Sequence, residues 1–183
     1  PTVGLSTYEA IRTDIIFGRL APDTKLKLDT MKAAYKASIS TLRESLNRLS
    51  SEGFVIAQEQ RGFFVAPISA ADLREIADLR ILLECNALRL SIENGDTDWE
   101  GSVAAAHHKL HRMEQQMLSG DETQKELWKR YDAEFHQSLI SACGSRNLME
   151  LHATIYDKYL RYQMQILTYR GDQAANEHKH LYE

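Results

Sequence analysis

Long apolar runs are absent from this sequence of 183 residues. No uninterrupted apolar stretch approaches the roughly 20 residues that a membrane-spanning helix needs. No signal peptide precedes the first predicted helix either. These absences exclude an integral membrane protein and lead us to expect a protein of the cytoplasm.

Cysteine and proline are scarce as well, with two and three residues respectively. Two Cys are too few for the disulfide framework of a small secreted domain, and the apolar neighbours of Cys85 and Cys143 predict buried free thiols. No Pro follows Pro67, so no Pro interrupts a helix in the rest of the chain. The hydrophobic content of 43% is enough for the core of one large domain or of two modest ones.

The acidic excess, a net charge of −4, by itself argues against a nucleic-acid partner. The net value hides a split, because residues 1–67 carry nine Lys or Arg against seven Asp or Glu, whereas residues 68–183 carry thirteen against nineteen. All seven His residues lie in the second segment. A mildly basic segment joined to an acidic one is typical of a protein in which only one domain contacts phosphates.

Ser38–Val65 has the pattern of a helix that is followed at once by a β-hairpin. Leu42, Leu46 and Leu49 recur at helical spacing and predict one buried stripe. Gly53 ends the predicted helix. The strands of the hairpin are predicted at 54–57 and 63–65.

The polar face of this helix and the tip of the hairpin suit contacts with DNA. A helix in the major groove presents base and phosphate contacts from its first turn, and an Arg beside a Gly at a hairpin tip suits the minor groove. We therefore predict DNA contacts from seven residues, namely Ser38, Ser40, Thr41, Arg43, Arg48, Arg61 and Gly62. An amphipathic helix with a hairpin can also be plain scaffold, so these residues alone leave both interpretations open.

Two helices are predicted before this unit. The capping box 6–9 opens the first helix and Gly18 closes it. The second helix is predicted over roughly 29–36. Helix, short helix, turn, recognition helix and hairpin in this order make a winged helix-turn-helix, with three helices and a β-hairpin. We assign this DNA-binding domain to residues 1–67.

The remainder of the chain, residues 68–183, is predicted to be helical throughout. A capping box of Ser69 and Asp72 starts its first helix. No strand pattern interrupts the helical periodicity, which favours an antiparallel helix bundle and a mainly α fold for the whole chain. The predicted helices lie near 70–94, 98–118, 123–142, 146–169 and from 172 onward.

One pair of residues in this bundle has the spacing of metal ligands. Asp132 and His136 are four apart and therefore point the same way from one helix. His178, near the start of a later helix, is a candidate third ligand. An ordinary surface ion pair explains the Asp–His spacing equally well, so both interpretations stay open. His107 and His111 share the spacing, but we expect them to be solvated or lightly packed, because the apolar stripe of their helix lies elsewhere.

Four phrases in the first 65 residues resemble the DNA-binding domain of GntR-family bacterial transcription regulators. These phrases are 15–22, 42–49, 52–55 and 61–65. The recognition helix departs from the family at two positions, because Ile39 stands where members often carry Arg, and Thr41 where they often carry Pro. Absence of the Arg contact is expected to shift operator preference, since an Arg–guanine pair contributes about 1–3 kcal/mol of discrimination.

The helical half resembles the effector-binding FCD domain of the FadR-type branch of that family. The matching phrases are 72–76, 79–84, 132–136 and 177–181. The resemblance implies that Asp132, His136 and His178 bind a divalent metal ion, with zinc as the first choice and nickel or manganese as alternatives. It also implies that Arg80 clamps the carboxylate of a small effector. The family has another metal-binding His on a final helix beyond Glu183, so we expect this chain to lack its last helix.

Domain order, charge and resemblance together predict a transcription regulator, a repressor or an activator, and not an enzyme. We expect a homodimer on double-stranded operator DNA, because one recognition helix makes too few contacts for specific binding. The bacterial protein would then associate with the nucleoid when bound. Two alternatives stay open. One is a metal-dependent hydrolase, for which no motif places a general base or nucleophile, and the other is a helical protein-interaction module.

Overall fold

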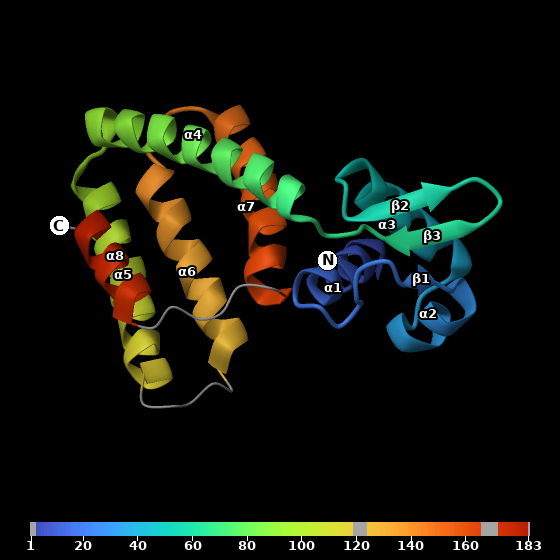
Figure 1. Ribbon diagram of the computed structural model, residues 1–183. Helices are drawn as coiled ribbons and strands as arrows, with labels where there is room; N and C mark the ends of the chain where they lie inside the picture. The colour runs from blue at the N-terminus through green and yellow to red at the C-terminus, as the bar shows by residue number, and fades with distance from the viewer. Residues whose placement is uncertain (1–2, 119–123, 166–171, 183) are drawn as a thin grey trace. The chain divides into compact units, whose positions relative to one another are not determined.

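The computed structural model describes residues 3–118, 124–165 and 172–182 (Figure 1). The chain divides into two compact units. Unit 1 consists of Pro1–Ile76 and Asp157–Leu167, and unit 2 consists of Ala77–Tyr156 and Thr168–Glu183. The predicted mainly α fold is confirmed, whereas the predicted domain boundary between residues 67 and 68 stays a prediction.

The N-terminal part of unit 1 has the predicted winged helix-turn-helix order. Its elements are α1 (Val3–Ile16), β1 (Lys25–Leu26), α2 (Leu28–Tyr35), α3 (Ile39–Ser51), β2 (Val55–Gln58) and β3 (Gly62–Val65). The buried stripe is also as predicted, because Leu42, Leu46 and Leu49 of α3 have no exposed surface. Ile11 and Ile15 of α1 are likewise fully buried, and α1 packs against α3. Burial of such side chains stabilises the unit by roughly 1.5–3 kcal/mol each.

Two predictions for this unit were wrong in detail. Helix α1 begins at Val3 and not at the capping box, because Ser6 and Glu9 both lie on its exposed face, inside the helix. The sheet has a third strand, β1, which pairs antiparallel with β3 and gives the order β1-β3-β2. A strand of two residues is too short to show an alternating pattern, so only pairing with β3 reveals it.

Tyr8 joins α1 to the end of α3. Its hydroxyl donates to the carboxylate of Glu52, with oxygen–oxygen distances of 2.6 and 2.7 Å. The guanidinium carbon of Arg48 lies 3.8 Å from the centre of the Tyr8 ring. Burial and the hydrogen bond to Glu52 raise the pKa of Tyr8 to about 12. The neutral phenol therefore stabilises the folded winged helix-turn-helix.

Tyr8→Phe is expected to lower the free energy of unfolding by about 2 kcal/mol near pH 8, because a hydrogen bond to a charged group is lost. In the wild-type protein this contribution is complete below the ordinary Tyr pKa of 10.0 and is lost as the pH rises towards about 12. Urea unfolding of both proteins should show the difference shrink by about 1 kcal/mol between about pH 8 and about pH 10.5. A difference that does not change with pH would contradict this role of Tyr8.

The remaining elements are five helices, which agree with the predicted ones to within a few residues. They are α4 (Ala70–Asn94), α5 (Thr97–Leu118), α6 (Lys125–Ile140), α7 (Arg146–Gln165) and α8 (Asp172–Tyr182). The predicted cap of α4 is confirmed, since the Asp72 amide donates to Ser69 Oγ at 3.1 Å. The parts of the predicted helices at 123, 166–169 and 183 lie outside the described residues. No helix among the described residues is both long and apolar enough to cross a membrane.

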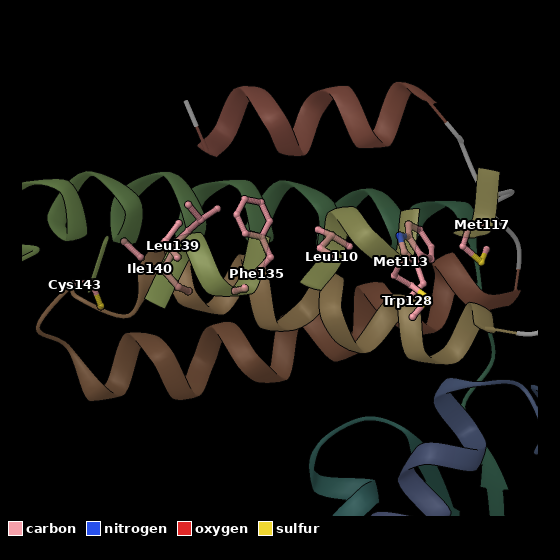
Figure 2. Packing of buried hydrophobic residues seen from close by; sticks show 11 residues of the cluster. Leu110, Met113, Met117, Trp128, Phe135, Leu139, Ile140 and Cys143 are labelled. Carbon is pink, nitrogen blue, oxygen red and sulfur yellow. The ribbon is translucent and has the colours of Figure 1, made fainter. Parts of the chain in front are cut away.

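The core of unit 2 lies mainly between α5 and α6, and α8 packs against α5 (Figure 1). Figure 2 shows its labelled members in a row from Cys143 at one end to Met117 at the other. The burial of Cys143 is as predicted, but Cys85 is exposed. Its apolar neighbours misled the prediction, because Leu82 on the same face of α4 is itself 66% exposed.

Candidate metal centre and DNA-reading surface

Two helices bring the three predicted metal ligands together. Helix α6 carries Asp132 and His136 one turn apart, and α8 carries His178. The ligand atoms of all three lie within 4.8 Å of one another. His178 Nε2 is 3.1 Å and His136 Nε2 4.0 Å from Asp132 Oδ1. Two ligands that are each about 2.1 Å from one ion lie at most about 4.2 Å apart, so each of the two Asp132–His pairs is close enough for one divalent ion to bridge.

Asp132 is held as a buried carboxylate. Tyr156 donates to its Oδ2 at 2.7 Å, and Lys129 Nζ lies 3.3 Å from the same oxygen. Burial alone would raise the pKa of Asp132, but the hydrogen bond from His178 and the positive charge of Lys129 outweigh it and lower that pKa well below its usual range. The carboxylate is therefore ionised at neutral pH, as a metal ligand must be.

The two His residues have different protonation. Burial lowers the pKa of His136 to about 4, so its ring is neutral at pH 7 and has a lone pair for a metal. Burial acts in the same direction on His178, but its hydrogen bonds with Asp132 and Glu114 outweigh burial and raise its pKa to about 9. An ion bound beside Asp132 would have to displace a proton from His178.

Arg80 of α4 lies next to this cluster. Its Nη2 is 3.3 Å from His136 Nδ1, and its Nε donates to Glu84 Oε1 at 2.8 Å. His152 Nε2 lies 2.8 Å from the same Glu84 oxygen, and His152 has no exposed surface. The guanidinium carbon of Arg80 is 4.8 Å from the centre of the Tyr156 ring. The predicted effector residue is thus beside the predicted metal ligands.

Several residues of this site were not predicted from the sequence. Glu114 of α5 is the one with a readable signal, because it interrupts the apolar stripe formed by Leu110, Met113 and Met117. An acidic residue at a core position needs a partner. Glu84 and His152 come from separate helices, 68 residues apart in sequence, and only packing brings them together.

His107 does not belong to the metal cluster. Its ring stacks on Tyr182 with a centroid distance of 4.4 Å and an interplanar angle of 3°. It is half-buried, whereas His111 is exposed. The prediction of solvated or lightly packed His residues on this helix is therefore confirmed.

The first turn of α3 presents the predicted DNA-contact residues. Ser38 caps the helix, with the Thr41 amide donating to Ser38 Oγ at 3.1 Å. Ser40 and Arg43 are exposed, and in the described part of the chain no hydrogen bond or ion pair engages the Arg43 side chain. Arg48 differs, because it lies over the Tyr8 ring and its Nε is 3.3 Å from Glu52 Oε1.

The hairpin also has the predicted shape. Gly62 begins β3 with a φ of +92°, a conformation that favours glycine, and Gln60 has a φ of 58°. Arg61 is exposed between them. No neighbouring atom lies within 4 Å of a Cβ built on Gly62, so this end of the hairpin is open.

A helix-turn-helix with a wing, joined to a helical domain that clusters Asp and His residues, defines the class of DNA-binding transcription regulators. Residues 4–65 match the family described as bacterial regulatory proteins, gntR family, and residues 75–183 match the FCD domain. The chain belongs to the GntR family and carries an FCD domain. It is a DNA-binding transcription regulator and not an enzyme.

Relatives with more than 30% identity to this chain include two HTH-type transcriptional regulators. The uncharacterized HTH-type transcriptional regulator BphR of Paraburkholderia xenovorans (strain LB400) is 35% identical over 174 residues, which are 95% of this chain and 71% of BphR. The HTH-type transcriptional repressor GlaR of Escherichia coli (strain K12) is 31% identical over 159 residues, 87% of this chain and 71% of GlaR.

Two solved structures share the fold. Escherichia coli McbR/YncC superposes with a TM-score of 0.76 at 19% identity, over 98% of this chain and 82% of that one. A putative GntR regulator from Rhodococcus sp. RHA1 has a TM-score of 0.72 at 22% identity, over 98% and 84%. At these identities the likeness concerns the fold alone.

Proposed function

We propose that this regulator is controlled by a small carboxylate that binds, together with a divalent metal ion, in the helical domain. One observation carries the proposal. Asp132, His136 and His178 converge from two helices to within 4.8 Å, with Arg80 beside them. Ligands and a cationic side chain at one place suit a carboxylate that is bound by both.

Asp132, His136 and His178 would hold the ion. Three protein ligands leave positions open for an effector, and the metal would supply positive charge that orients its carboxylate. Arg80 would add a charge-assisted hydrogen bond. Asp and His suit zinc, with nickel or manganese as alternatives.

The DNA-binding form is proposed to be a homodimer on a palindromic operator. One exposed α3 first turn with Arg43 and one wing with Arg61 offer few contacts. Two half-sites about one helical turn apart would double them and match the two-fold symmetry of a dimer. Regulation then follows if the effector changes the affinity of that dimer for its operator.

Helix α7 supports coupling between effector and DNA. Its Tyr156 donates to Asp132 at 2.7 Å, and the next residue, Asp157, pairs with Arg12 of α1. A change at Asp132 on ligand binding would therefore act on α7, whose Asp157 pairs with Arg12 of the winged helix-turn-helix. Coupling of this kind typically amounts to about 1–3 kcal/mol, or about 5- to 150-fold in DNA affinity.

A screen of small carboxylates against DNA release tests the proposal. The DNA is a duplex selected by the protein from a random pool, and release is followed by fluorescence anisotropy with and without a chelator. We expect at least one carboxylate to change DNA affinity only when metal is present. If the protein binds no divalent metal, and chelation leaves DNA release unchanged, the metal role is wrong.

Arg43→Ala is expected to weaken binding to the selected operator about 10- to 100-fold, because a side chain that contacts base or phosphate is lost. Electrophoretic mobility shift at several salt concentrations measures the change. Arg112→Ala is the matched control, since Arg112 is exposed on α5 in the other unit and should leave affinity unchanged. Equal affinities of the two variants would contradict the placement of α3 as the recognition helix.

A further inference from the structure

We infer that Glu114 is a positioning residue that sets which nitrogen of His178 faces the metal, an inference that rests on the proposed metal role. Glu114 lies on α5, whereas the three candidate ligands lie on α6 and α8. Its carboxylate is hydrogen-bonded to Nδ1 of His178, the ring nitrogen on the side away from Asp132, so it would act through His178 and not as a ligand of the ion.

The geometry of the His178 ring supports this role. Nδ1 of His178 is 2.6 Å from Glu114 Oε1, and Nε2 is 3.1 Å from Asp132 Oδ1. As a carboxylate, Glu114 can only accept, so Nδ1 must carry the proton of this hydrogen bond. Nε2, which lies beside Asp132, is then the nitrogen that would give up its proton to bind a metal.

The burial of Glu114 also supports a positioning role for its contact with His178. Only 1% of its surface is exposed, and it lies among apolar residues of α5. A buried carboxylate is unfavourable unless it is hydrogen-bonded, so packing alone would favour an apolar residue here. Among the described residues, Glu114 Oε2 has no hydrogen-bond partner. Among the described residues, the hydrogen bond of this carboxylate is therefore the one to His178.

The position of the ring is also limited from its edge. The Phe135 ring contacts that of His178 with a centroid distance of 5.8 Å and an interplanar angle of 79°. Glu114 and Phe135 together hold the imidazole in one orientation before a metal arrives. Carboxylate partners of ligating His residues typically contribute about 10- to 100-fold in metal affinity.

The test compares metal binding and His178 protonation in three proteins. Wild type, Glu114→Gln and Glu114→Leu are titrated with Zn²⁺ in competition with a chromophoric chelator, and ¹⁵N-labelled His signals report which ring nitrogen carries the proton. We expect affinity to fall about 10- to 100-fold in Glu114→Leu, and the zinc-bound protein to lose the single Nδ1–H form of His178. Glu114→Gln keeps the size and an acceptor oxygen and should fall between the two.

A matched control is Glu100→Leu, because Glu100 is exposed on the same helix. It should bind Zn²⁺ like the wild type. If wild type binds Zn²⁺ and both Glu114 variants bind it equally well with His178 still protonated on Nδ1, the positioning role is overturned and the metal site stands. If wild type itself binds no Zn²⁺, the proposed function and this inference are both overturned.

Discussion

Asp132→Asn is expected to lower the affinity for Zn²⁺ or Co²⁺ by about 100-fold or more. This loss is larger than the one caused by removing a side chain that only hydrogen-bonds to a metal ligand. Asp132 lies at the centre of the cluster, because its Oδ1 faces both His178 and His136. Asn keeps the shape but removes the only anionic group among the three candidate ligands. Isothermal titration calorimetry measures the change directly.

Asp78→Asn is the control for this substitution, since Asp78 is exposed on α4 and should leave metal binding unchanged. Circular dichroism of the metal-free proteins shows whether Asp132→Asn still folds, which its unchanged volume favours. Metal affinity equal to that of the wild type, in a folded variant, would exclude Asp132 as a ligand.

Phe135→Ala is expected to lower the free energy of unfolding by about 3–5 kcal/mol, because it leaves a cavity in the core of unit 2. Phe135 has no exposed surface and lies in the middle of the row of core residues (Figure 2). Its ring also contacts those of His107 and His178, so the substitution removes packing against both of these rings as well.

Chemical denaturation in urea measures this effect. Leu151→Ala on α7 is the matched control, because 48% of Leu151 is exposed, and its cost should stay within about 0.5 kcal/mol. A loss below about 1 kcal/mol for Phe135→Ala would mean that the core of unit 2 rearranges to fill the space.

The winged helix-turn-helix was largely predictable, because the sequence patterns that specify it are local. The spacing of Leu42, Leu46 and Leu49, the Ser38 cap and the φ of +83° at Gly53 each act within a few residues. The strand β1 was not predictable, since its two residues have no pattern of their own. The same local reading placed Cys85 in a core, because apolar neighbours along the chain do not say which face of α4 is covered.

The candidate metal centre shows most clearly which residues a sequence can predict and which only the packing of helices brings together. Four-residue spacing on one helix put Asp132 and His136 on the same face, and family resemblance suggested His178. Nothing along the chain showed that Glu114, Glu84 or His152 would join them, since each reaches the site from another helix. The position of Glu114 inside the apolar stripe of α5 is the nearest the sequence comes to such a signal.

The sequence by itself determined the order of the helices, the winged helix-turn-helix and the candidate ligands Asp132 and His136. Helix periodicity, caps and turns depend on neighbours in the chain, so a sequence is enough to predict them. The tertiary structure alone decided which side chains surround His178, how Arg80 meets His136 and which thiol is exposed. Those contacts depend on how helices pack, and packing brings together residues that are far apart in sequence. Control of DNA binding by an effector, as proposed, would be exerted through such long-range contacts.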